Sequence, residues 1–111
     1  MELKLCPKHK IALVPNETKY GTRFHCRQDG CTVVCWDGST STPADYETRQ
    51  ARMLAHAAFD QLWRSGLFTR KTAYKKLSVY LGLKPKDTHI GLFDAETACK
   101  AKEFARGLLA V

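Results

Sequence analysis

Residues 6–9 read Cys-Pro-Lys-His, and residues 26–31, which begin seventeen residues after this histidine, read Cys-Arg-Gln-Asp-Gly-Cys. Each string has the form of a knuckle, a tight turn that points two metal ligands at one ion. Three cysteines and one histidine make the closed tetrahedral set of a structural zinc site, with bonds of about 2.3 Å to sulfur and about 2.0 Å to nitrogen. We therefore predict one structural Zn²⁺ ion, held by Cys6, His9, Cys26 and Cys31.

Two alternatives to this ligand set remain open in the sequence. Cys35 lies four residues past Cys31, so these two form another possible pair, and His25 is an alternative to His9 or Cys26. In an extended chain, however, the backbone positions of Cys31 and Cys35 lie about 13 Å apart, and the β-branched residues between them resist the turn that would close this distance. We therefore predict that Cys35 is a buried thiol.

The ligand set indicates the role of the metal. A site filled by four protein ligands leaves no position for water or substrate, so the zinc is expected to fold the chain and not to catalyse. The N-terminal residues show no export signal, and thiols stay reduced in the cytosol, which favours a metal site over disulfides. No apolar run reaches the roughly 18 residues of a membrane span. We expect a soluble intracellular protein without membrane association.

The 111 residues divide by composition into two parts. Residues 1–36 are predicted to form a zinc ribbon of short strands, at 11–14, 23–25 and 32–36, in which the metal replaces a hydrophobic core. Residues 37–42 are small and polar and form a linker. Residues 43–111 are predicted to form a compact three-helix unit packed on the ribbon as one domain. The predicted fold class is α+β.

The first predicted helix covers residues 43–64, with Thr42 as its N-cap and Pro43 in its first position. Apolar residues at helical spacing predict its buried stripe, which consists of Ala51, Leu54, Ala55, Ala58 and Leu62.

Two further helices follow. One begins at Thr69 as N-cap and ends at Leu81, before Gly82 in a left-handed position. Its predicted inward positions are Ala73, Tyr74, Leu77, Tyr80 and Leu81. Asp94 is the predicted cap of the last helix, which runs to Leu109. Its candidate inward positions are Ala98, the Lys102 stem, Ala105 and Leu109, or Cys99 and Phe104, with Cys99 interpreted as a small core side chain.

The positive net charge of the chain favours an acidic binding partner. The net charge is +7, and basic side chains concentrate on the outer face of the second predicted helix. Alternatively, these basic side chains have no partner and form the solvent-exposed face of the helix. The candidate surface for nucleic acid or another partner consists of Arg70, Lys71, Lys75 and Lys76, joined by Arg23 and Arg27 of the ribbon.

Three strings outside the ribbon carry a resemblance. They are His-Ala-Ala-Phe-Asp-Gln-Leu-Trp at 56–63, Arg-Lys-Thr-Ala-Tyr-Lys-Lys-Leu at 70–77 and Thr-His-Ile-Gly-Leu-Phe-Asp at 88–94. With the knuckles they resemble the small zinc-finger-containing proteins of bacteriophages and prophages. Typical members carry Cys-x-x-Cys in both knuckles, whereas here His9 replaces a cysteine and the second pair is widened to Cys31. The resemblance implies a zinc ribbon and the cytoplasm of a bacterial host, with no established activity.

The same strings contain a possible second polar site, formed by His56, Asp60 and His89. A hydrolytic acid/base reaction or an anion site is one interpretation, and structural hydrogen bonds and caps are the other. No phosphate loop or nucleophile motif supports catalysis.

Three functions follow, in order of preference. The first is a non-enzymatic nucleic-acid-binding module. The second is a phage effector that binds a host enzyme or defence complex, and the third is a small hydrolase.

Overall fold

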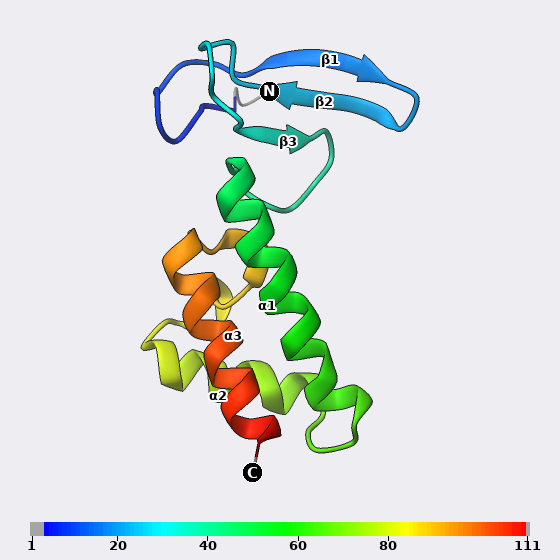
Figure 1. Ribbon diagram of the computed structural model, residues 1–111, viewed down its shortest axis with the longest axis vertical. Coiled ribbons are helices and arrows are strands. Elements are labelled where there is room, and N and C mark those ends of the chain that lie inside the picture. Colours follow the sequence, from blue (N-terminus) through cyan, green and yellow to red (C-terminus); the bar gives the residue numbers. More distant parts are fainter. Residues whose placement is uncertain (1–3, 111) are drawn as a thin grey trace. The chain divides into compact units, whose positions relative to one another are not determined.

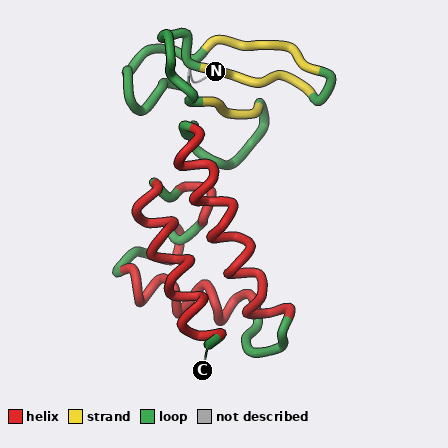
Figure 2. Tube along the Cα trace, viewed as in Figure 1, coloured by secondary structure: helices red, strands yellow, loops and turns green. Residues whose placement is uncertain are grey.

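A computed structural model describes residues 4–110. Strands occupy the N-terminal part and helices the remainder, which confirms the predicted α+β class (Figure 1, Figure 2). The strands are β1 (Val14–Thr18), β2 (Gly21–His25) and β3 (Val34–Trp36), and the helices are α1 (Tyr46–Arg64), α2 (Arg70–Leu81) and α3 (Ala95–Leu109). Two 3₁₀ turns lie between α2 and α3, η1 (Pro85–Asp87) and η2 (Ile90–Leu92).

The three strands form one antiparallel sheet in the order β1-β2-β3. Val14 pairs with His25 and Thr18 with Gly21, so a two-residue loop closes the β1-β2 hairpin. The predicted strand at 11–14 is wrong, because β1 begins at Val14 and continues through Pro15. Proline cannot donate a ladder hydrogen bond, but β1 is an edge strand, where this loss is tolerated.

The start of α1 also differs from the prediction, since the helix begins at Tyr46 and not at Pro43. Ala44 is held extended by two backbone hydrogen bonds with Val34, at 3.0 and 3.2 Å. The Tyr46 N–H donates to the side-chain oxygen of Thr32 at 2.9 Å, so a residue fourteen positions earlier satisfies this N–H of the first turn. Both interactions are non-local, and helix start signals in the sequence do not reveal them.

The buried face of α1 consists of Arg52, Ala55, Phe59 and Leu62. Ala55 and Leu62 confirm the predicted stripe, whereas Leu54 is half exposed and was wrongly placed in it. Arg52 belongs to the buried face because its Nε donates a 2.7 Å hydrogen bond to the Phe93 carbonyl. Charged side chains are rarely buried unless they are paired in this way.

The bounds of α2 agree with the prediction. Thr69 accepts a hydrogen bond from the Thr72 N–H, and Gly82 ends the helix at φ 69°, where a side chain would be strained. Ala73 and Leu77 are fully buried. Tyr80 was predicted to point inward, but it is half exposed and stacks on Phe104 of α3 with ring centroids 4.7 Å apart.

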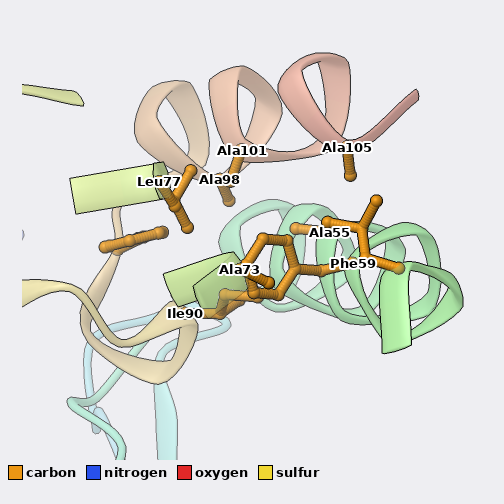
Figure 3. Close-up of a cluster of buried hydrophobic side chains, with 10 residues drawn as sticks. Ala55, Phe59, Ala73, Leu77, Ile90, Ala98, Ala101 and Ala105 are labelled. Carbon is orange, nitrogen blue, oxygen red and sulfur yellow. The ribbon is translucent and has the colours of Figure 1, made fainter. Parts of the chain in front are cut away.

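The last helix, α3, begins after Asp94, whose carboxylate accepts the Thr97 N–H at 2.8 Å, as predicted for its cap. The buried positions of α3 are Ala98, Ala101 and Ala105, and Figure 3 shows their side chains pointing into the helical core. Cys99 is exposed, so its assignment to the core is wrong.

The chain divides into two units, residues 1–47 and 48–111, and each has its own buried cluster. The cluster of the first unit is small and consists of Cys6, Leu13, Cys26, Val33 and Cys35. The larger helical cluster includes Phe59, Leu62, Leu77, Ile90 and Phe93 together with five alanines. Figure 3 labels these alanines and three of the larger side chains, Phe59, Leu77 and Ile90. None of the helices described here is long and apolar enough to cross a membrane.

Candidate functional site

The structure brings together the four side chains that the sequence predicts as zinc ligands. Within residues 4–110, their ligand atoms form a group in which every atom lies within 4.8 Å of the others, and this group consists of Cys6, His9, Cys26 and Cys31. Cys6 and Cys26 are buried, Cys31 is half-buried and His9 is exposed. The first pair precedes β1, and the second follows β2 directly. The β1-β2 hairpin therefore returns the chain to the first knuckle.

The separations between the ligand atoms fit zinc. The Sγ of Cys6 lies 3.7 Å from the Sγ of Cys31, and the Nδ1 of His9 lies 3.6 Å from the Sγ atoms of Cys6 and Cys26. A tetrahedral ion with the usual zinc bond lengths separates two sulfurs by about 3.8 Å, and a sulfur from a nitrogen by about 3.5 Å. A disulfide would require only about 2.05 Å between sulfurs. These separations match a site in which the four residues hold one zinc ion.

Local backbone geometry shapes both knuckles. In the first, the Cys6 carbonyl accepts the Lys10 N–H at 2.8 Å, and Lys10 adopts φ 59°, a region that lysine rarely enters. In the second, Gly30 adopts φ 79°, and the Cys31 N–H donates to the Gln28 carbonyl at 3.1 Å. The sequence signalled the second turn through its Asp-Gly step, but gave no signal for the left-handed lysine.

The electrostatics of the site favour a thiolate at Cys6. Burial opposes ionisation there, but hydrogen bonds from the backbone and side chain of His9 and from the Lys8 backbone outweigh it and lower the pKa of Cys6 to about 6. At Cys26, burial raises the pKa, and the neighbouring thiols add to the shift. A cysteine binds zinc as its thiolate, so the lowered pKa prepares Cys6 to bind the ion.

The alternative ligands lie outside the cluster. The Sγ of Cys35 accepts a 3.2 Å hydrogen bond from the Lys4 ammonium and lies 3.6 Å from the carbonyls of Trp36 and Ser41. Cys35 is buried, as predicted. The Nδ1 of His25 lies 3.3 Å from the Cys26 carbonyl, and His25 is not among the residues whose ligand atoms converge. The ligand choice made from spacing therefore agrees with the geometry.

Acid should release the zinc. Protons compete with the metal for the thiolates and the imidazole, and bound zinc holds the thiols ionised below their metal-free pKa. We therefore expect zinc to stay bound at pH 7 and to be released only well below the pKa of about 6 that Cys6 has without metal. A chromophoric zinc chelator, followed during an acid titration, measures this release. Zinc retained unchanged at pH 4 would contradict the assigned ligands.

The predicted basic residues of α2 are exposed on the helical unit. Arg70, Lys71 and Lys75 line an open groove of about 730 Å³, together with Tyr74 and the segment that contains His89. The Arg70 guanidinium lies 5.7 Å from the centre of the Tyr74 ring. Lys76 does not line this groove, and its ammonium lies 5.4 Å from the centre of the Phe68 ring. The sequence predicted the cations but not the groove.

The two basic candidates of the ribbon lie in different surroundings. Arg23 pairs with Trp36 across β2 and β3, and its guanidinium lies 5.6 Å from the centre of the Trp36 ring. Arg27 is exposed in the second knuckle. Both lie in the unit of residues 1–47, whereas the four basic residues of α2 belong to residues 48–111.

Of the three residues of the possible second polar site, one lines the groove on α2. His89 lines the groove on α2, but His56 and Asp60 are not among the residues that line it. The Asp60 carboxylate lies 4.0 Å from the Arg64 guanidinium one turn later, and His56 is exposed. The ring of His89 instead faces Tyr74, at 6.2 Å between centroids.

Comparison with known proteins agrees with the metal centre. A family model described as a zinc-finger-containing domain matches residues 5–106, a range that includes all four ligands, α1, α2 and most of α3. No curated protein and no solved structure gives a significant match. Family and geometry together assign one structural zinc ion to the cysteine and histidine cluster.

Proposed function

The chain belongs to this family of zinc-finger-containing domains, and from that premise we propose that it is a non-enzymatic nucleic-acid-binding module whose helical unit supplies the binding surface. In this proposal the zinc ion stabilises residues 1–47, because its four protein ligands leave no coordination position for a substrate.

The distribution of charge carries this proposal. Residues 48–111 contain twelve Lys and Arg against five Asp and Glu, a net charge of +7, whereas residues 1–47 contain six of each. The excess thus belongs entirely to the helical unit. Within that unit, α2 has four basic residues and no acidic one. Exposed cations of this density attract the phosphate backbone without reading its sequence.

Binding should depend on α2 and on salt. The double variant Lys71→Gln and Lys75→Gln is expected to weaken binding of a short DNA on the order of tenfold at 0.1 M salt, because two phosphate contacts are lost. Each lost contact should also reduce the slope of log affinity against log salt concentration by roughly 0.7 to 0.9. Fluorescence anisotropy at several salt concentrations measures both the affinity and its dependence on salt.

The matched control removes the same charge elsewhere. Lys100 and Lys102 lie on α3, within 3.6 and 4.0 Å of the carboxylates of Glu96 and Glu103. The double variant Lys100→Gln and Lys102→Gln should bind almost as tightly as the parent protein. Equal weakening by both double variants would mean that only net charge matters, and would contradict a binding surface on α2.

The second candidate partner is an acidic surface of a bacterial host protein, as the resemblance to phage proteins suggests. The same α2 cations would then face carboxylates. Binding to nucleic acid weakens steeply with salt, whereas a protein interface also buries apolar surface and is less sensitive. Retention of one bacterial protein at 0.5 M salt, with no DNA bound at 0.05 M, would favour this partner over nucleic acid.

A further inference from the structure

The groove on α2 has features that a plain phosphate-binding surface does not need. Its volume of about 730 Å³ lies within the range of small-molecule sites, roughly 300–1,000 Å³. It lies between α2 and the segment that begins with η1, and most of its lining is carbon. Cations that contact only phosphates work equally well on a flat surface, so the apolar hollow calls for a ligand with an apolar face.

The ring of Tyr74 forms a rigid part of the groove. It packs edge-on against the fully buried Phe59 at 4.8 Å between centroids, and it stacks with Trp63 at 6.3 Å and an interplanar angle of 26°. Arg70 lies within 6 Å of both Tyr74 and Trp63. Because the core holds this ring in place, a planar ligand can pack on it without first ordering the side chain.

A short loop supplies the opposite wall. The hydroxyl of Thr88, which is buried, donates a 2.8 Å hydrogen bond to the Lys84 carbonyl, and the Thr88 N–H donates to the Pro85 carbonyl. These bonds fix the position of His89, whose exposed ring lies 6.2 Å from that of Tyr74. Two aromatic rings therefore line the hollow, one on α2 and one on the loop.

The charges of the groove have one sign. Arg70, Lys71 and Lys75 line it, and no Asp or Glu is among its lining residues within the described chain. Aromatic rings beside cations match a ligand that carries a flat ring and a negative group on the same unit. A nucleotide has this composition, whereas an acidic peptide offers carboxylates without the flat ring.

We infer that this groove holds one unpaired nucleotide, with its base beside Tyr74 and His89 and its phosphate against Lys71 and Lys75. This inference rests on the proposed function and specifies its ligand as single-stranded nucleic acid. In a duplex the bases are stacked and paired, so they reach such a hollow only at the cost of unstacking.

The test compares two single strands of ten nucleotides, one ordinary DNA and one abasic at every position. Both carry the same phosphates, so the ratio of their dissociation constants isolates the contribution of the bases. Fluorescence anisotropy should give about tenfold tighter binding of the ordinary strand, the size expected when one base stacks on aromatic side chains. His89→Ala should reduce this ratio by about threefold or more.

The control variant is His56→Ala, which removes an exposed histidine that does not line the groove and should leave the ratio unchanged. Near-ultraviolet circular dichroism verifies that both variants keep their packing. Equal affinity of the parent protein for the two strands would overturn the groove assignment but leave nucleic-acid binding in place. The same conclusion would follow if His89→Ala gave the same ratio of dissociation constants as the parent protein. Failure to bind either strand would overturn the proposed function as well.

Discussion

Cys6→Ser is expected to abolish zinc binding and to unfold residues 4–47. Cys6 is fully buried, and its sulfur lies 3.6 Å from the His9 Nδ1 and 3.7 Å from the Cys31 sulfur. Three of the five residues in the buried cluster of this unit are cysteines, so little hydrophobic burial remains without the metal. Zinc binding contributes about 10–16 kcal/mol to the folding of zinc-finger peptides at pH 7. This is more than the free energy of unfolding of a unit of this size.

Zinc content by mass spectrometry and an amide-resolved NMR spectrum measure the two effects. The helical unit should keep its dispersed signals, because its core lies within residues 55–105. Cys35→Ser is the matched control, since it changes a buried cysteine of the same unit whose sulfur contacts Lys4 and two carbonyls. This variant should retain one zinc ion. Loss of zinc from Cys35→Ser, together with retention by Cys6→Ser, would contradict the ligand set.

Leu62→Ala should destabilise the helical unit strongly. Leu62 lies on α1 with no exposed surface, and it belongs to the cluster that includes Phe59 and Leu77. Truncation of a buried leucine costs about 2–5 kcal/mol, part of it from the cavity that remains. A loss of this size is a large share of the stability of a small unit. Thermal unfolding followed by far-ultraviolet circular dichroism should show a lower midpoint by roughly 10 °C or more.

Leu54→Ala is the matched control, because it makes the same chemical change on the same helix at a position that is 50% exposed. Leucine and alanine both favour helices, so its effect on stability should stay within about 0.5 kcal/mol. Helical spacing alone predicts both leucines in one buried stripe, and this pair of variants distinguishes the two positions. A larger effect at Leu54 than at Leu62 would show that the packing face of α1 is wrong.

Local signals explain what the sequence predicted well. The Cys-x-x-H and Cys-x4-Cys spacings belong to short turns, and the resistance of the residues between Cys31 and Cys35 to turning disfavoured Cys35 as a ligand, in agreement with the observed cluster. The caps at Thr69, Gly82 and Asp94 act within a few residues of their helix ends, and all three are in place. Such features depend on neighbours in the chain, which the sequence displays directly.

Non-local contacts explain what the sequence could not predict. Pairing of Ala44 with Val34 delays α1 by three residues, and the edge position of β1 admits Pro15. The groove depends on η1 and the fixed loop before α3, a segment without periodic hydrophobicity. Cys99 is exposed because Ala98 and Ala101 fill the buried positions beside it.

The proposed function divides two roles between the units: zinc stabilises the unit of residues 1–47, and the unit of residues 48–111 binds nucleic acid. The most direct measurement is the amide NMR spectrum of the zinc-loaded protein, titrated with a short single-stranded DNA. The largest shifts should fall on residues 70–76 and 84–89, with the four zinc ligands and the strands little changed. Shifts centred on the zinc knuckles or the strands, or no shifts at all, would contradict this division.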